Sequence, residues 1–165
     1  MAECKTLFDV YSYYDDEQLD KDFPVPKEIT TRYFKNNIEA DEEYKNMSAK
    51  DLEAKKIEGI TLRERLLLEI QYFKETNKHL DMGSITLCSG SRDSDGFVPC
   101  VNWYAGDHKV SVSRCNVDGR SDVIRGRATV YPSDLSPSST SHPECVSRTE
   151  FNEFKEKVGK IIRID

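Results

Sequence analysis

Residues 61–74 place the strongest constraint on the fold, because their pattern is typical of an amphipathic helix. Thr61 and Glu64 have the spacing of a capping box, in which each side chain accepts a hydrogen bond from the other residue's backbone N–H. Apolar side chains recur at helical spacing along the same segment: Leu62, Leu66, Leu67, Ile70 and Phe73. Because a stripe of this kind normally packs on a core, we expect one main helix that covers a sheet.

Four short runs after this helix have the pattern of strands: residues 84–88, 97–104, 109–114 and 123–130. In the second and third runs, Val101, Trp103, Val110 and Val112 alternate with polar residues, as half-buried strands require. Residues 105–108 between these runs are typical of a hairpin connection. The sequence therefore predicts an α+β fold, a small antiparallel sheet of three or four strands packed against one main helix, with a C-terminal helix.

Composition divides the chain into four segments. We interpret residues 1–58 as an acidic N-terminal region and residues 59–131 as the α+β core. Residues 132–146 are rich in Ser and Pro and have the composition of a linker. Residues 147–165 are predicted to form a helix, because Ser147 and Glu150 have capping-box spacing.

The net charge of −6 is confined to the N-terminal region, where 15 acidic and 9 basic residues lie within residues 1–58. An acidic region repels nucleic acid, so a nucleic-acid partner is disfavoured and a protein partner is expected. Aromatic residues accompany these acids: Tyr11, Tyr13, Tyr14, Tyr33, Phe34 and Tyr44. Two interpretations stay open, since such side chains form a binding surface or pack this region on the core.

The five cysteines are odd in number and have no paired close spacing. With no signal-peptide pattern and no apolar run long enough to span a bilayer, we expect a cytoplasmic protein with free thiols and no membrane contact. Cys88, Cys100, Cys115 and His108 lack the spacing of a zinc site. Residues 93–96 suit a polar turn better than a calcium loop. No metal and no cofactor are predicted.

No catalytic motif is present, and this favours a binding role. The alternative is a small hydrolase or nuclease whose site is assembled in space from His108, Arg114, Asp122 and Arg125. A second alternative is an accessory or virion structural protein.

Candidate binding residues come from two regions. Arg125 and Arg127 share one strand face, where they can hold a phosphate or carboxylate or belong to a solvated mixed-charge surface. The full set of predicted binding residues is Asn102, Tyr104, Arg114, Arg125, Arg127, Asp15, Asp16 and Glu17. Strand positions around Asn102 and Tyr104 either form a diversified binding surface or vary as exposed positions ordinarily do.

Part of the chain resembles uncharacterised short proteins of phages and bacteria. The resemblance rests on residues 63–69, 78–81, 86–92, 94–96, 98–99, Trp103 and 125–130. It implies a phage or mobile-element origin, and so a location in the host cytoplasm. It gives no indication of a particular activity. The sequence hypothesis is therefore a non-enzymatic protein-binding module of this type, an inhibitor of a host system being one such role.

Overall fold

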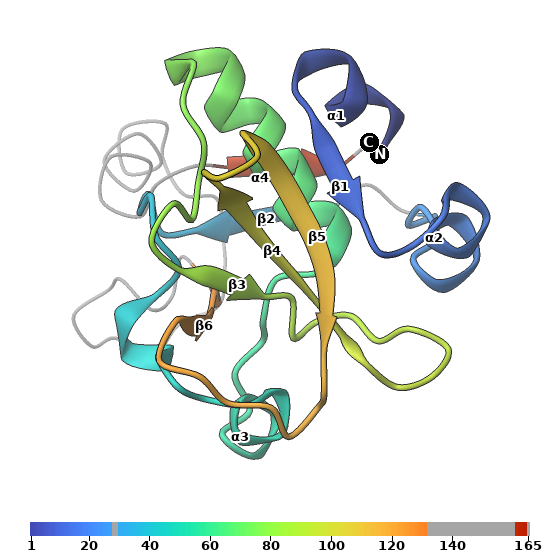
Figure 1. Ribbon diagram of the computed structural model, residues 1–165. Helices are drawn as coiled ribbons and strands as arrows, with labels where there is room; N and C mark the ends of the chain where they lie inside the picture. The colour runs from blue at the N-terminus through green and yellow to red at the C-terminus, as the bar shows by residue number, and fades with distance from the viewer. Residues whose placement is uncertain (28–29, 132–160, 165) are drawn as a thin grey trace, which may run out of the picture.

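The computed structural model describes residues 1–27, 30–131 and 161–164 (Figure 1). Its most regular element is helix α4 (Leu62–Thr76), which confirms the predicted main helix. Both hydrogen bonds of the capping box are formed: Glu64 N donates to Thr61 Oγ1, and Thr61 N donates to the Glu64 carboxylate. The helix ends at Asn77, which adopts a left-handed conformation that Asn tolerates better than most residues.

Helix α4 packs on one face of a five-stranded sheet. The strand order is β1–β5–β4–β3–β6. The strands are β1 (Val10–Ser12), β3 (Ile85–Leu87), β4 (Val98–Tyr104), β5 (Lys109–Cys115) and β6 (Ile124–Gly126). Leu62, Leu66 and Ile70 of the helix are buried in one cluster with sheet residues Val101, Val110 and Val112. This packing places the centre of the core between α4 and the β4–β5 ribbon.

The pairing of these strands is mixed rather than purely antiparallel. Strands β3, β4 and β5 form the predicted antiparallel meander. However, β6 pairs in parallel with β3, and β1 pairs in parallel with β5. The prediction of an all-antiparallel sheet of three or four strands is therefore correct only in outline. The sheet gains its fifth strand from the N-terminal region.

A second, three-stranded sheet has the order β7–β2–β8. Its strands are β2 (Thr30–Phe34), β7 (Thr129–Val130) and β8 (Ile161–Ile164). The predicted run 123–130 is thus two strands in different sheets, β6 and β7, separated at Arg127 and Ala128. Strand β8 corrects the predicted C-terminal helix at residues 161–164, where backbone pairing with β2 replaces helical bonding. The rest of that predicted helix, and the linker, lie outside the described residues.

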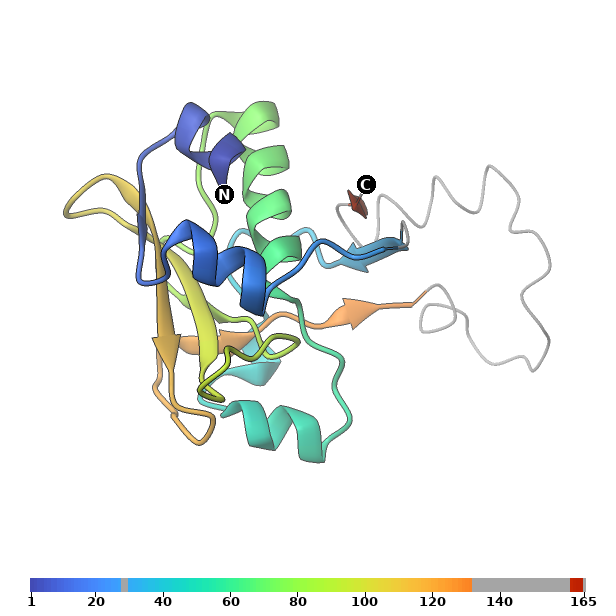
Figure 2. The ribbon, with the colours of Figure 1, turned by 90° about the vertical axis from the view of Figure 1, so that its right-hand side faces the viewer.

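The remaining helices lie in the N-terminal part of the chain (Figures 1 and 2). They are α1 (Ala2–Leu7), α2 (Asp16–Asp22), the 3-10 turn η1 (Glu42–Tyr44) and α3 (Ala49–Ala54). Cys4, Tyr14 and Phe23 from this part are buried in the same cluster as α4. Some of its aromatic residues therefore pack on the core, whereas Tyr11 and Tyr13 are exposed.

Two further findings concern the cysteines and the helices. Cys100 and Cys115 on neighbouring strands are joined by a disulfide, so the prediction of free thiols is wrong for this pair. Antiparallel pairing of β4 and β5 brings the two close, with a Cα–Cα distance of 6.4 Å. Among the described helices, none has the length and apolar character needed to cross a membrane.

Candidate functional site

The sheet face opposite α4 is only partly covered. Because side chains alternate along a strand, Tyr11, Ser111 and Asn102 share this face, and the register places them in one row across β1, β5 and β4. Tyr104 and Lys109 form the next pair on the same face. Figure 2 shows α4 on one side of the β4–β5 ribbon, and Tyr104 and Lys109 lie on the other side, near the hairpin that joins the two strands. We call this surface, formed by Tyr11, Asn102, Tyr104, Lys109 and Ser111, the open sheet face.

Two tyrosines dominate the open sheet face. Tyr11 is 51% exposed and Tyr104 is 54% exposed, although large aromatic side chains are usually more buried. Tyr104 and Asn102, both predicted binding residues, therefore lie together here. The other end of the same face, at Leu87 and Cys100, is covered by α3 through Leu52.

The predicted acidic residues lie at the β1 edge of this sheet, where α2 follows β1 (Figure 1). Asp15 caps α2 by accepting a hydrogen bond from Gln18 N at 2.7 Å. Asp16 pairs with Lys5 at 2.9 Å, and Glu17 is exposed. The first turn of α2 is thus an acidic segment that follows β1 in the chain, and we call it the acidic border.

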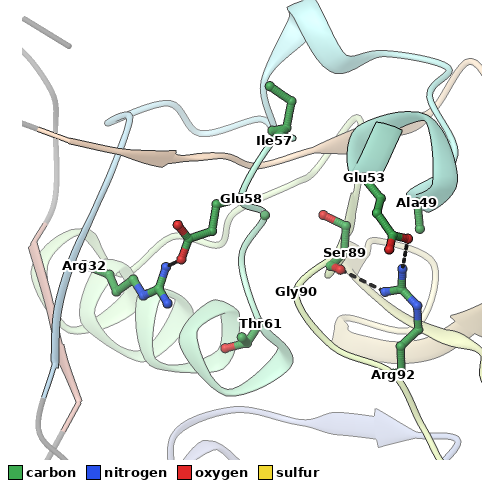
Figure 3. Close-up of a pocket in the computed structure, with 10 residues that line it drawn as sticks. Arg32, Ala49, Glu53, Ile57, Glu58, Thr61, Ser89, Gly90 and Arg92 are labelled. Carbon is green, nitrogen blue, oxygen red and sulfur yellow. Dashed lines mark hydrogen bonds and ion pairs between the residues drawn. The ribbon is translucent and has the colours of Figure 1, made fainter. Parts of the chain in front are cut away.

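A groove lies at the start of α4. It consists of two adjoining pockets of about 430 and 390 Å³ that share Arg32, Thr61, Gly90 and Arg92. We call these two pockets the α4 groove. The larger pocket, drawn in Figure 3, has Arg32 and Glu58 on one side of the 58–61 segment and Arg92 and Glu53 on the other.

The charged groups of the larger pocket are held to different extents. The guanidinium of Arg32 pairs with Glu58 and, through Nε at 3.2 Å, with the buried Glu64. Arg92 Nη1 donates to two backbone carbonyls, of Ser89 and Ser91, each at 2.8 Å. By contrast, Arg92 Nη2 lies 3.8 Å from Glu53, whose side chain is 75% exposed. The Arg92–Glu53 pair is therefore the loosest contact of the pocket.

A fully buried set of charges lies between α4 and the sheet. Arg65, Glu69, Asp81 and Arg127 have side chains with 0% exposure, and we call them the buried ionic cluster. Arg65 contacts Glu69 at 2.7 Å and Asp81 at 2.8 Å. Arg127 contacts Asp81 at 3.0 Å and also donates to the carbonyls of residues 37 and 38.

The buried ionic cluster gives Arg127 a structural role. The sequence placed this residue beside Arg125 on an exposed face, but its side chain lies inside the protein and faces Asp81. Burial alone would raise the pKa of Asp81, yet the neighbouring Arg65 and Arg127 charges outweigh burial and hold it below its ordinary value. Asp81 is thus a carboxylate that balances two buried guanidinium groups.

His79 extends this cluster toward the aromatic core. Its Nδ1 lies 2.9 Å from Glu69, and its ring stacks on Trp103 with centroids 3.6 Å apart. The neighbouring Cys88 is also buried, and burial raises the pKa of its thiol to about 12. A thiol with this pKa is unsuited to nucleophilic chemistry at neutral pH.

Arg114 is engaged within the protein. Its guanidinium lies between the rings of Tyr13 and Phe97, 4.4 and 4.2 Å from their centroids, and pairs with Asp95 at 3.1 Å. Asp93, 3.6 Å away, also accepts a hydrogen bond from Tyr14 Oη. This arrangement fastens the N-terminal region to the start of β4.

The residues of the alternative catalytic site are spread over the fold. His108 lies in the turn before β5, and Arg114 lies near the other end of that strand. Six residues of extended chain separate them by about 20 Å. Arg125 pairs with Glu42 at β6, and Asp122 is exposed before that strand. The structure does not bring His108 and Arg114 together.

Metal ligands do not gather anywhere in residues 1–27, 30–131 and 161–164. Asp93 instead organises the predicted turn at 93–96 by accepting from the backbone N–H groups of Asp95 and Phe97. Gly96 has the positive φ of 85° that such a turn requires.

The predicted binding residues do not include Arg32, Glu53 and Arg92, which line the α4 groove, and the sequence did not indicate the buried ionic cluster. The first set comes from three distant segments, and nothing in their local pattern joins them. In the buried ionic cluster, Arg65 and Glu69 have the i,i+4 spacing of a helical ion pair. Ion pairs with this spacing usually lie on the protein surface, so the spacing does not indicate burial.

Comparison with known proteins adds no identity to this geometry. The chain matches no family model, and neither curated proteins nor solved structures give a match. The proposals that follow therefore rest on the contacts, burial and charges described above.

Proposed function

We propose that this protein is a non-enzymatic protein-binding module that contacts its partner through the open sheet face and the acidic border of α2. The observation that carries the proposal is the exposure of Tyr11 and Tyr104 on the part of the sheet face that α3 leaves uncovered. Tyrosine combines a large apolar ring with a polar tip and is enriched among residues that dominate binding energy.

The polar residues of this face support the same role. Asn102 and Ser111 lie between the two tyrosines and offer hydrogen-bonding groups that adapt to a partner. Because the sheet backbone is paired, the surface is presented on a rigid scaffold.

The acidic border indicates the chemistry of the partner. Asp15, Asp16 and Glu17 form the first turn of α2, which follows β1 in the chain, so a basic protein surface is the expected target. The nucleic-acid groove of a host enzyme is one surface of that kind, and a phage-type inhibitor of such an enzyme is part of this proposal.

The test is affinity purification of the tagged protein from its own host, followed by mass spectrometry. Wild type is compared with a Y11A/Y104A variant, a D15N/D16N/E17Q variant and a V25A control, whose apolar side chain is exposed but is not one of the residues of the open sheet face. We expect one stoichiometric basic partner that is lost with Y11A/Y104A, weakened with the acidic variant and retained with V25A.

Two results would contradict the proposal. One is a partner that binds wild type and Y11A/Y104A equally well. The other is the absence of any stoichiometric partner. Circular dichroism of each variant controls for folding, since all altered side chains are exposed.

A further inference from the structure

The larger pocket of the α4 groove has the dimensions of a small-molecule site. Its volume of about 430 Å³ lies within the range of about 300–1,000 Å³ that is usual for ligand pockets. Gly59 and Gly90 line it where two backbone segments meet: a Cβ atom on Gly90 would lie 2.4 Å from the Gly59 carbonyl oxygen. The pocket therefore depends on glycine at that point.

The charges of this pocket are balanced, and this limits what it can bind. Two guanidinium groups and two carboxylates line it, as paired groups on opposite sides of the 58–61 segment (Figure 3). A phosphate would be attracted by the arginines but repelled by the nearby carboxylates. A ligand that carries one charge of each sign can pair with both kinds of group.

The two ion pairs differ in their ability to exchange partners. Arg32 and Glu58 are also bonded to Glu64 and Tyr131, so that pair is fixed on both sides. The Arg92–Glu53 pair is open: one nitrogen of Arg92 is anchored by backbone carbonyls, while the other faces Glu53 across 3.8 Å. Glu53 is mostly exposed and can move.

We propose that this pocket binds a small zwitterion, an α-amino acid with an apolar side chain, between Arg92 and Glu53. The ligand carboxylate pairs with Arg92 Nη2, and the ligand ammonium pairs with Glu53. Both contacts join opposite charges, and the exposed Glu53 moves away from Arg92 to admit the ligand. The apolar side chain packs against Ala49 and Ile57, which line the same pocket.

This inference is independent of the proposed protein partner, because the α4 groove and the open sheet face share no residue. The test is isothermal titration of the full-length protein with L-leucine, L-isoleucine, L-valine and L-methionine. The best of these is then compared with its amide, its N-acetyl derivative and inorganic phosphate. We expect one free amino acid to bind, and each blocked derivative to bind at least about tenfold more weakly.

Variants assign the two contacts. E53Q is expected to weaken the free amino acid about tenfold and to leave the N-acetyl derivative unchanged, because Glu53 contacts only the ammonium. R92Q is expected to weaken both. R120Q is the matched control, since Arg120 forms an exposed pair with Asp51 outside the pocket.

The proposal is overturned if none of the four amino acids binds. It is also overturned if phosphate binds more tightly than the amino acid, or if E53Q binds the amino acid like wild type. Because Glu53 is exposed, E53Q folds and keeps the test decisive even where R92Q does not.

Discussion

The buried ionic cluster and the α4 groove contain the same chemistry in opposite surroundings. Each joins two arginines to two carboxylates, and both adjoin α4. The side chains of the buried ionic cluster have 0% exposure, whereas those of the pocket pairs range from 30% to 75%. This difference determines whether an ion pair can exchange its partner. A buried pair cannot separate without leaving an unpaired charge away from water, whereas water solvates the separated charges of an exposed pair.

Substitution of Asp81 is expected to have the largest effect. D81N removes the charge that balances Arg65 and Arg127, and the two guanidinium groups stay buried. Breaking such a pair costs about 3–5 kcal/mol of unfolding free energy. Urea denaturation followed by circular dichroism measures this loss. A D81N variant as stable as wild type would show that the cluster does not hold the fold together.

The pH dependence of stability is the next largest effect. The pKa of Asp81 is lower in the folded state than its ordinary value of 3.8. A depressed pKa contributes stability above the unfolded-state value, and this contribution is lost as pH falls through the folded-state value. Unfolding free energy is therefore expected to decline below pH 3.8.

Four other carboxylates must be separated from this effect. Two of them are Asp22 and Glu43, whose pKa values are lowered first by hydrogen bonds with Ser94 and Lys35, so both are replaced by the amide in the measurement. Asp51 also has a pKa below its ordinary value, caused first by its hydrogen bond with Arg120, so the measurement is repeated in D51N. Burial raises the pKa of Asp41, which adds stability as pH falls, but above pH 3.8. If the unfolding free energy of the D51N variant does not change below pH 3.8, the role assigned to Asp81 is excluded.

Thr61 caps α4, the helix that carries Arg65 and Glu69, and also lines the α4 groove. T61A removes the acceptor for Glu64 N and is expected to cost about 1 kcal/mol. T61S keeps the hydroxyl and serves as the control. Thermal unfolding of the pair measures the difference. Equal stability of T61A and T61S would show that the cap adds nothing.

Glu53 is expected to give the smallest effect on stability. E53Q alters an exposed group at 3.8 Å from its partner, so the unfolding free energy should change by less than about 0.5 kcal/mol. Comparison of E53Q with D81N under the same conditions measures how far burial changes the contribution of an arginine–carboxylate pair to the unfolding free energy. A loss as large as that of D81N would remove the distinction between the two regions.

Local signals predicted local structure well. The capping box predicted at Thr61 is formed, and the turn at 105–108 joins β4 to β5. Those features depend on residues a few positions apart, where side-chain bonds to the backbone decide the conformation.

Long-range pairing was not predictable in the same way. Strand β1 has three residues, too few for an alternation pattern, and its place beside β5 depends on a partner far along the chain. Arg127 was misplaced because its burial depends on Asp81, 46 residues earlier. The candidate site was found only in part: Tyr104 and Asn102 follow from strand alternation, whereas the α4 groove depends on tertiary contacts.

The parallel pairing of β1 with β5 has a consequence for how the chain folds. Val10 is paired with Val110, so the two partners lie 100 positions apart in the sequence. During synthesis the N-terminal region leaves the ribosome long before its partner strand exists. Contacts of such long range slow folding, because the loop must close before any pairing energy is gained. Strand β1, which places Tyr11 beside Ser111, can therefore pair only after β5 has been synthesised. The open sheet face is thus completed late in folding.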